Sequence, residues 1–328
     1  MNLQEIKYCP GTLAEGFDTY SRACLNRVFA GKKVHYVLPY NSPASQIGED
    51  ELFDENRKRM SISGVQEKFS VLLEKNKLRL TTNEERGTYI LKPIPNLGKK
   101  AEQMPANEHL TMQIARQVYG IETAENALIF FKDGKQAYIS KRFDVKANGT
   151  KLAQDDFASL AERTAQSHGE HYKYLGNYLE MFQLMHKYLP IYKLEMPKLM
   201  KILVFNYLIS NGDAHFKNFS LLETTMGDYR LSPAYDLLNT RIHIDDKDFA
   251  LDQALLPPDL AQGKMSLQFA KLSECAGISE KTFNDIMVLM LSQSNKVEKM
   301  VAASFLNEST KKNYWQAYQG KLKQLMKS

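Results

Sequence analysis

An aspartate and an asparagine in the second half of the chain have the types and spacing that phosphoryl transfer requires. Asp213 and Asn218 lie five positions apart in SNGDAHFKNFSLL (210–222), directly after an apolar, helix-like segment. A carboxylate there would orient a substrate hydroxyl, and a nearby amide oxygen would hold Mg²⁺ on the phosphates. Lys217, between the two, would steady the transferred phosphoryl group. A polar loop is the open alternative, because Asn-Gly-Asp is also turn chemistry.

Asp236 supplies a second carboxylate further along the chain. It stands in the apolar stretch LSPAYDLLNT (231–240), where a charged group is costly unless it is paired or binds a metal. Mg²⁺ prefers one or two carboxylate or amide oxygens together with phosphate and water, so Asn218 and Asp236 form a candidate metal pair. An Asp exposed at a strand end or capping a helix is the alternative.

Three features of the first half would complete a nucleotide site. SISGVQEK (61–68) is a Ser/Gly turn that runs into a strand and would lay N–H groups over phosphates, although it lacks the Walker pattern. Lys92 ends the apolar run TYILKP and would reach the phosphates, with Glu108 as its acidic partner; a strand-end lysine extended to solvent is the alternative. ISKRFDV (139–145) is the predicted crossing between lobes, where the backbone and Phe143 would hold an adenine.

The elements that position these residues divide the chain in two. Short β-type runs occupy 69–75, 77–82, 88–93, 127–133 and 135–143, and Asp133-Gly134 predicts a hairpin between the last two. One helix, 107–120, ends on Gly120 as a C-cap. Helical periodicity then dominates in 175–189, 196–210, 282–301 and 310–328. We therefore predict an α+β, two-lobed fold with a sheet-rich nucleotide-binding lobe (1–144) and an all-helical catalytic lobe (145–328).

Composition narrows the class of protein. The 328 residues are 43% hydrophobic and 25% charged, which is ordinary for a globular protein and excludes collagen-like, disordered and disulfide-scaffold classes. The net charge of +5 is too weak to indicate nucleic-acid binding. No apolar run approaches the ~18 residues of a membrane span, and the start has no secretory signal pattern. There are three cysteines, Cys9, Cys24 and Cys275. This small, odd number predicts a protein of the reducing cytoplasm. It is also too few to supply the four ligands of a structural zinc site.

The order of these features resembles a known family. SISGVQEK, YILKP, NEHLTM, KRFD, NGDAHFKNFSLL and LSPAYDLLNT, read in order from about residue 57 to 240, resemble the HipA-like serine/threonine kinase toxins of bacterial toxin–antitoxin systems. The resemblance implies a two-lobed, kinase-like fold that uses ATP and Mg²⁺ in the bacterial cytoplasm. The usual kinase sequence motifs GxGxxG, HRD and DFG are absent.

The resemblance also assigns roles residue by residue. Asp213 resembles the catalytic base, Asn218 and Asp236 the metal pair, and Lys92 the phosphate lysine. The nucleotide contacts that it implies are Ser63, Gly64, Val65, Gln66, Glu67, Lys68, Lys92, Glu108, Lys141, Arg142, Phe143, His215, Lys217, Asn218, Tyr235 and Asp236. Family members phosphorylate themselves on a serine of the glycine loop, which is Ser61 here, with Ser63 as a second acceptor.

Partners and targets follow from the same resemblance. It implies an antitoxin of the HipB type, contact with DNA only through that antitoxin, and an aminoacyl-tRNA synthetase as the protein substrate whose loss arrests growth. Only 60 residues precede Ser61, whereas full-length members carry an additional N-terminal module there. This resembles the short HipT-type kinases, in which the module is a separate small protein of the HipS type.

Two other functions are open on the sequence. A small-molecule kinase of the aminoglycoside or lipid type would keep the Asp213–Asn218 spacing and Asp236 without needing Ser61 or Ser63. A pseudokinase acting as a DNA-bound co-repressor would use the lysines of the last helix, although a solvated helix face explains those lysines equally well. Intact Asp213, Asn218, Asp236 and Lys92 argue against a dead site.

Overall fold

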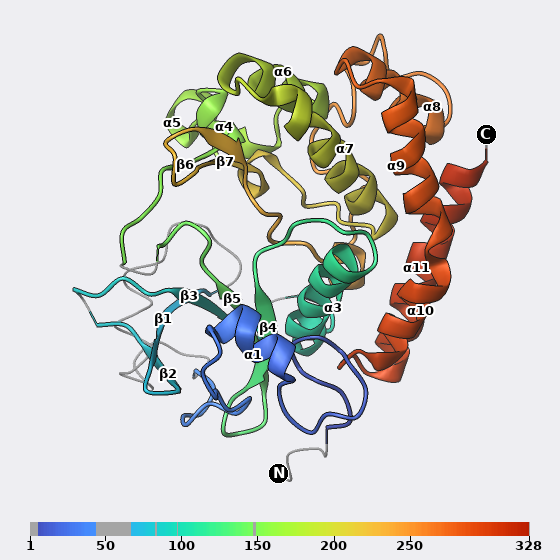
Figure 1. The fold of residues 1–328 in the computed structure, drawn as a ribbon. Coiled ribbons are helices and arrows are strands. Elements are labelled where there is room, and N and C mark those ends of the chain that lie inside the picture. The colour runs from blue at the N-terminus through green and yellow to red at the C-terminus, as the bar shows by residue number, and fades with distance from the viewer. Residues whose placement is uncertain (1–5, 44–66, 83, 97, 147–148, 328) are drawn as a thin grey trace.

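The computed structural model describes residues 6–43, 67–82, 84–96, 98–146 and 149–327. A sheet-rich part and a helical part lie on either side of helix α3 (Met104–Gln117) (Figure 1). The other helices are α1 (Arg22–Phe29), α4 (Phe157–Leu160), α5 (Ala165–His168), α6 (Tyr178–Tyr188), α7 (Tyr192–Leu208), α8 (Met265–Cys275), α9 (Glu280–Ser292), α10 (Ser294–Ala303) and α11 (Glu308–Met326).

The larger sheet is antiparallel, with the strand order β2-β1-β3-β5-β4. Its strands are β1 (Phe69–Glu74), β2 (Lys77–Leu80), β3 (Tyr89–Pro93), β4 (Asn126–Phe130) and β5 (Gln136–Lys141). All five predicted β-type runs therefore form strands. The predicted hairpin is also confirmed, because β4 pairs with β5 and Gly134 between them has a φ of +84°.

Both faces of this sheet are covered, and the side chains alternate between two hydrophobic clusters. On β4, Ala127 and Ile129 face the N-terminal segment and α1, whereas Leu128 and Phe130 face α3 and the core of the helical part. A central strand buried on both faces can be apolar throughout, which explains the unbroken apolar run of β4. The cluster on the α3 side continues into the helices, so α3 ties the two parts together.

Helix α3 begins three residues before the predicted position and ends as expected. Pro105 occupies its first turn, where a missing N–H costs nothing. At the other end, Gly120 has a φ of +61° and the Ile121 N–H bonds to the Ala115 carbonyl at 2.9 Å. This closing pattern is the one a C-terminal glycine provides.

The prediction of an all-helical second half is wrong in one respect. A three-stranded antiparallel sheet, in the order β6-β7-β8, lies there between the helices. Its strands are β6 (Gln154–Asp156), β7 (Ser220–Glu223) and β8 (Tyr229–Leu231). These strands have three or four residues each, too few to show alternation in the sequence, and β6 (Gln-Asp-Asp) carries no apolar residue.

The four helical segments predicted for the second half are helical in the structure, whereas α4, α5 and α8 lie outside them. The expected helix 282–301 is two helices, because α9 ends at Ser292 and α10 begins at Ser294. Helix α7 is buried around most of its circumference from Leu199 onward. None of the helices within the described ranges is long and apolar enough to cross a membrane. The α+β, two-lobed fold class is confirmed, and the boundary at residue 144 stays a prediction.

Candidate active site

Lys92 lies at the centre of the site, between two carboxylates. Its Nζ donates to Glu108 Oε1 at 2.6 Å and also to Asp236 Oδ1. The lysine comes from β3, the glutamate from α3, and the aspartate from the segment after β8. Only 6% of the Lys92 side chain and 2% of the Glu108 side chain are exposed. The structure therefore excludes the alternative of a strand-end lysine extended to solvent.

Electrostatics act differently on the three members of this trio. Burial opposes the charge on Lys92, but Asp236 and Glu108 outweigh it and raise the pKa of Lys92 above its usual value. Burial also opposes ionisation of Asp236, yet Lys92 and Lys68 hold the pKa of its carboxyl well below the usual range. For Glu108 burial prevails, and its pKa is raised despite Lys92. Asp236 is thus the carboxylate that stays ionised at neutral pH.

Asp236 brings the two candidate metal residues together. Its Oδ2 accepts from Asn218 Nδ2 at 3.4 Å and lies 3.6 Å from Lys68 Nζ. Asp236 has a φ of +55°, a left-handed conformation that Asp tolerates better than most residues. Asn218 ends the short 3₁₀ helix η3 (Phe216–Asn218), so a sharp turn on each side aims the two side chains at each other.

Asp213 reaches the same region from the end of α7. The chain leaves the helix through Ser210, which has a φ of +56°, and the Gly212 N–H then donates to Thr240 Oγ1 at 2.9 Å. A β-carbon at Gly212 would lie 2.3 Å from the carbonyl oxygen of Lys247. The glycine of the Asn-Gly-Asp sequence is therefore required for close packing, and it places Asp213 at the surface of the site.

A tyrosine that the sequence did not point to holds the Asp213 carboxylate. The Tyr174 hydroxyl donates to Asp213 Oδ1 at 2.9 Å, and its ring packs edge-on against His215, with centroids 5.1 Å apart. Tyr174 belongs to the 3₁₀ helix η2 (Tyr172–Tyr174). Burial raises the pKa of Asp213, and the Tyr174 hydroxyl opposes that rise. Asp213 is thus a partly desolvated carboxylate with one fixed oxygen.

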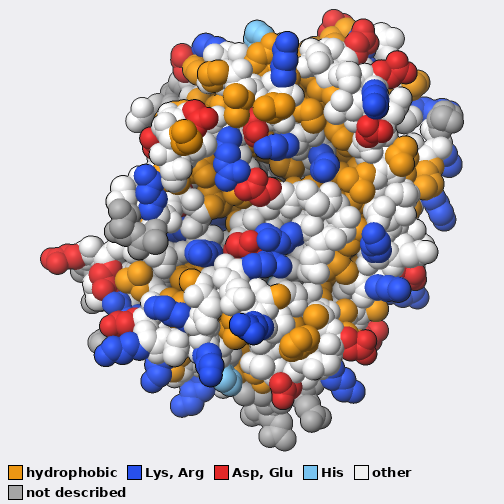
Figure 2. Space-filling view, viewed as in Figure 1, with side chains coloured by type: hydrophobic (Ala, Val, Ile, Leu, Met, Phe, Trp, Pro, Cys, Tyr) orange, Lys and Arg blue, Asp and Glu red, His pale blue; other side chains and the backbone are white. Residues whose placement is uncertain are grey.

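Two basic side chains, Lys173 and Lys217, lie near Asp213. Lys217 Nζ lies 3.2 Å from the Tyr172 hydroxyl, so the short helix η2 holds both Lys217 and Asp213. Burial lowers the pKa of Lys173, while Asp213 opposes that shift. Figure 2 shows Lys and Arg side chains among Asp and Glu side chains near the middle of the face that it draws. A concentration of cations beside a carboxylate suits a site that handles phosphate.

His215 lies behind these residues and carries no charge at neutral pH. Burial first, and then Lys173, lower the pKa of His215 to about 3. Its backbone N–H donates to Asn218 Oδ1 at 3.1 Å. His215 therefore orients the amide of Asn218 through the main chain.

The predicted lobe crossing runs beside Tyr235. The backbone N–H groups of Lys141 and Arg142 already donate to carbonyls of neighbouring segments, at 2.7 and 2.9 Å. The Phe143 ring lies 5.7 Å from the Tyr235 ring, and the Tyr235 hydroxyl donates to the Lys217 carbonyl at 2.9 Å. The aromatic pair thus joins the crossing to the Asp213 loop, and the adenine contact stays a prediction.

The donor set fits Mg²⁺ bound together with phosphates. Asn218 and Asp236 are neighbours, and each carries a hard oxygen atom of the kind that Mg²⁺ prefers. It is Nδ2 of Asn218 that faces Asp236, while its Oδ1 accepts from the His215 N–H. Within the described part of the chain, no group of three or more His, Cys, Asp or Glu side chains could hold a metal by itself. A metal here would therefore complete its shell with phosphate and water, as in nucleotide-dependent phosphoryl transfer.

Several predicted residues lie outside the described part of the chain. They are Ser61, Ser63, Gly64, Val65 and Gln66. Glu67 and Lys68 are the first described residues after that gap, and Lys68 contributes to the site through Asp236. Lys68, the last residue of the predicted glycine loop, therefore lies beside Asp236 of the Lys92 trio.

The cysteines form no metal site among the described residues. Cys9 and Cys24 are both buried, and Cys275 is exposed. Cys9 Sγ accepts from the backbone N–H of Ser21 at 3.1 Å, and hydrogen bonds from Cys24 and Ser21 lower the pKa of Cys9 to about 4 against the effect of burial. This cluster packs behind the larger sheet, away from Asp213.

The sequence of this chain is similar to a protein family and to several proteins named as kinases. The family model of the HipA-like C-terminal domain matches residues 60–299. A Haemophilus influenzae protein named "Putative kinase" is 24% identical over 73% of this chain and 68% of its own length. "Putative kinase Y4dM" of Sinorhizobium fredii is 31% identical over 60% of this chain and 48% of its own. The chain thus spans about half to two thirds of these relatives.

Two solved structures share the fold. The toxin HipA of Shewanella oneidensis MR-1, determined with HipB and its operator DNA, superposes with a TM-score of 0.60 at 18% identity, over 80% of this chain and 63% of its own. The proinflammatory kinase CtkA of Helicobacter pylori superposes with a TM-score of 0.53 at 16% identity, over 77% of this chain and 92% of its own. At these identities the likeness establishes the fold.

Proposed function

The chain belongs to the HipA-like C-terminal domain family, and from its site we propose that it is a serine/threonine protein kinase that uses ATP and Mg²⁺. The observation that carries the proposal is Lys92, buried between Glu108 and Asp236. A buried lysine held by a helix glutamate, next to a carboxylate–amide pair, is the arrangement that positions and neutralises a triphosphate. A structural ion pair alone does not account for Lys68 and Asn218 converging on the same carboxylate.

Each residue of the site has a separate role in the proposed phosphoryl transfer. Asp213 accepts the proton of a substrate serine or threonine hydroxyl as that oxygen bonds to the γ-phosphorus and the bond to the ADP oxygen breaks. Tyr174 holds the carboxylate in place, and Lys217 attracts the equatorial phosphate oxygens. Mg²⁺ bound by Asn218 and Asp236 would neutralise charge on the phosphates. His215 stays neutral, so it does not compete with Lys217.

The proposed biological role is that of a growth-arresting toxin in the bacterial cytoplasm. The Shewanella relative was determined with HipB and operator DNA, which supports an antitoxin of the HipB type for this chain and DNA contact through that antitoxin. A separate small HipS-like protein is a further proposed partner. The proposed substrate is an aminoacyl-tRNA synthetase, and the proposed autophosphorylation sites are Ser61 and Ser63.

Labelled ATP tests this function directly. The purified chain, incubated with γ-labelled ATP, Mg²⁺ and total bacterial extract, should transfer label to itself and to a discrete protein. Asp213→Asn should transfer about 10²–10⁴-fold more slowly while still binding ATP. Label that appears only on aminoglycosides or lipids would instead indicate a small-molecule kinase. Absence of transfer, with operator binding that needs the antitoxin, would indicate a co-repressor pseudokinase.

A further inference from the structure

A cavity of about 550 Å³ opens between helices α7 and α9. Its volume is in the range of about 300–1,000 Å³ that small-molecule sites occupy. Every lining residue belongs to the described part of the chain. They are Gly120, Ile121, Glu122, Pro197, Lys198, Lys201, Ile202, Leu231, Ser232, Thr282, Asp285, Ile286 and Leu289.

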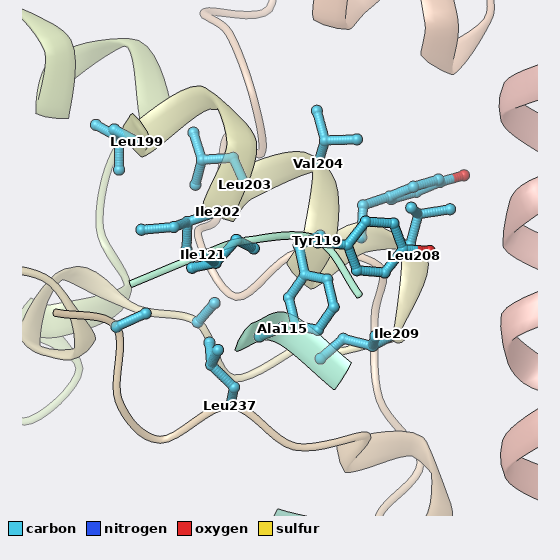
Figure 3. Packing of buried hydrophobic residues seen from close by; sticks show 14 of the residues in the cluster. Ala115, Tyr119, Ile121, Leu199, Ile202, Leu203, Val204, Leu208, Ile209 and Leu237 are labelled. Atoms are coloured by element: carbon cyan, nitrogen blue, oxygen red, sulfur yellow. The ribbon is translucent and has the colours of Figure 1, made fainter. Parts of the chain in front are cut away.

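The wall of this cavity is mainly apolar. Ile121 follows α3 and Ile202 lies on α7, and Figure 3 shows the two side chains next to each other in the core. Leu231 on β8, with Ile286 and Leu289 on α9, completes the apolar lining. Such a surface gains free energy when an apolar ligand group displaces water from it.

One lysine of the cavity wall has no charged or hydrogen-bonded partner among the described residues. Lys201 is half-buried, and among the described residues it has neither an ion-pair partner nor a hydrogen bond from its side chain. Burial lowers the pKa of Lys201, as expected when an ammonium group loses water without gaining a counter-charge. The neighbouring Lys198 differs, because its Nζ is held by Glu195 at 2.6 Å.

The acidic residues of the wall do not neutralise Lys201. Glu122 is paired with Arg230 at 2.9 Å, and Asp285 is exposed, where water screens its charge. The cavity therefore combines an apolar interior with a single desolvated cation. That combination is complementary to a ligand with an apolar body and one anionic end.

We propose that this cavity binds a small apolar molecule with one anionic group, its chain against Ile121, Ile202 and Leu289 and its anion beside Lys201. A medium-chain carboxylate and an alkyl phosphate both have this chemistry. The site does not overlap the candidate active site but shares a wall with it. Leu231 and Ser232 also line a small cavity that borders Asn218 and Asp236.

Titration calorimetry with defined probes tests the proposal. Decanoate and decyl phosphate are each added to the full chain below their micelle concentrations, and decanol is added below its solubility limit. At least one of the two anions should bind, and more tightly than decanol; which anion binds more tightly separates the carboxylate source from the phosphate source. If neither anion binds, or if decanol binds as tightly, the proposal is wrong.

Two variants and one control locate the site. Lys201→Met keeps an apolar side chain and removes the charge, so it should weaken anion binding about tenfold, as expected for one lost charge-assisted hydrogen bond, and leave decanol unchanged. Leu289→Trp should fill the cavity and abolish binding of all three probes. Lys299→Met removes an exposed lysine on α10 and should bind like the wild type. Unchanged anion binding in both Lys201→Met and Leu289→Trp would place the probes elsewhere and overturn the proposal, and circular dichroism verifies that each variant is folded.

Discussion

Replacing Tyr174 with Phe removes one hydrogen bond from Asp213 and little else. The Tyr174 hydroxyl donates to Asp213 Oδ1 at 2.9 Å, while the ring packs against His215 and stays in place in the variant. Because the hydroxyl stabilises the ionised carboxylate, its loss should raise the pKa of Asp213 further above its usual value. The buried setting of Asp213 already raises that pKa.

The size of the effect follows from the kind of hydrogen bond. A hydrogen bond to a charged group contributes about 1.5–3 kcal/mol, and about 1.36 kcal/mol corresponds to one pKa unit. Asp213 is only partly buried, so solvent replaces part of the lost bond and the lower figure applies. We expect the pKa of Asp213 to rise by about one unit.

The pH dependence of kcat/KM is the measurement that detects this shift. A general base works only when it is ionised, so the rate falls as pH decreases through its pKa. In Tyr174→Phe that acidic limb should lie about one unit higher than in the wild type. The two rates should converge at higher pH, where Asp213 is ionised in both proteins.

Tyr172→Phe is the matched control. Tyr172 lies on the same short helix, but its hydroxyl contacts Lys217 and not Asp213. Its variant should change the plateau rate without moving the acidic limb. If the limb of Tyr174→Phe coincides with that of the wild type, Tyr174 does not govern the ionisation of Asp213. An equal shift in Tyr172→Phe would mean that the whole helix, rather than one hydroxyl, is responsible.

Three more expectations concern the rest of the site. Asp236→Ala should weaken ATP binding in the presence of Mg²⁺, measured by calorimetry, and an unchanged dissociation constant would make Asp236 merely structural. Lys92→Met should lower the free energy of unfolding by about 3–5 kcal/mol, because it leaves Glu108 buried without its cation. Urea denaturation at neutral pH measures this change. A loss below ~1 kcal/mol would contradict the buried pair. Ser61→Asp/Ser63→Asp should bind ATP more weakly and arrest growth less, because negative charge there repels the phosphates; normal binding and killing would refute such a switch.

The larger sheet and the Lys92–Glu108 pair could be anticipated because their signals are local. Each strand shows its pattern within a few residues, and the Asp133-Gly134 turn fixes the register of its hairpin. Lys92 ends a strand and Glu108 lies in the next helix, so their pairing needs only that this helix cover the sheet. That requirement follows from the apolar face of the helix.

The features that could not be anticipated depend on contacts between distant segments. Strand β6 consists of Gln-Asp-Asp and is a strand only because β7, more than sixty residues later, pairs with it. Tyr174 meets Asp213 across thirty-nine positions, and no periodic pattern surrounds it. The cavity beside Lys201 likewise exists only because α9 packs near α7, and the sequence does not reveal that these two helices meet.

The geometry around Asp236 links metal binding to nucleotide binding. Its carboxylate already receives Lys92 on one oxygen, and Lys68 with Asn218 on the other. Mg²⁺ alone would add two positive charges beside Lys92 and Lys68, which already occupy both oxygens of Asp236. A triphosphate removes this obstacle, because its oxygens attract both lysines and free Asp236 for the metal. Metal and nucleotide should therefore bind together. The surroundings of Lys68, which directly precedes β1, should change when they do.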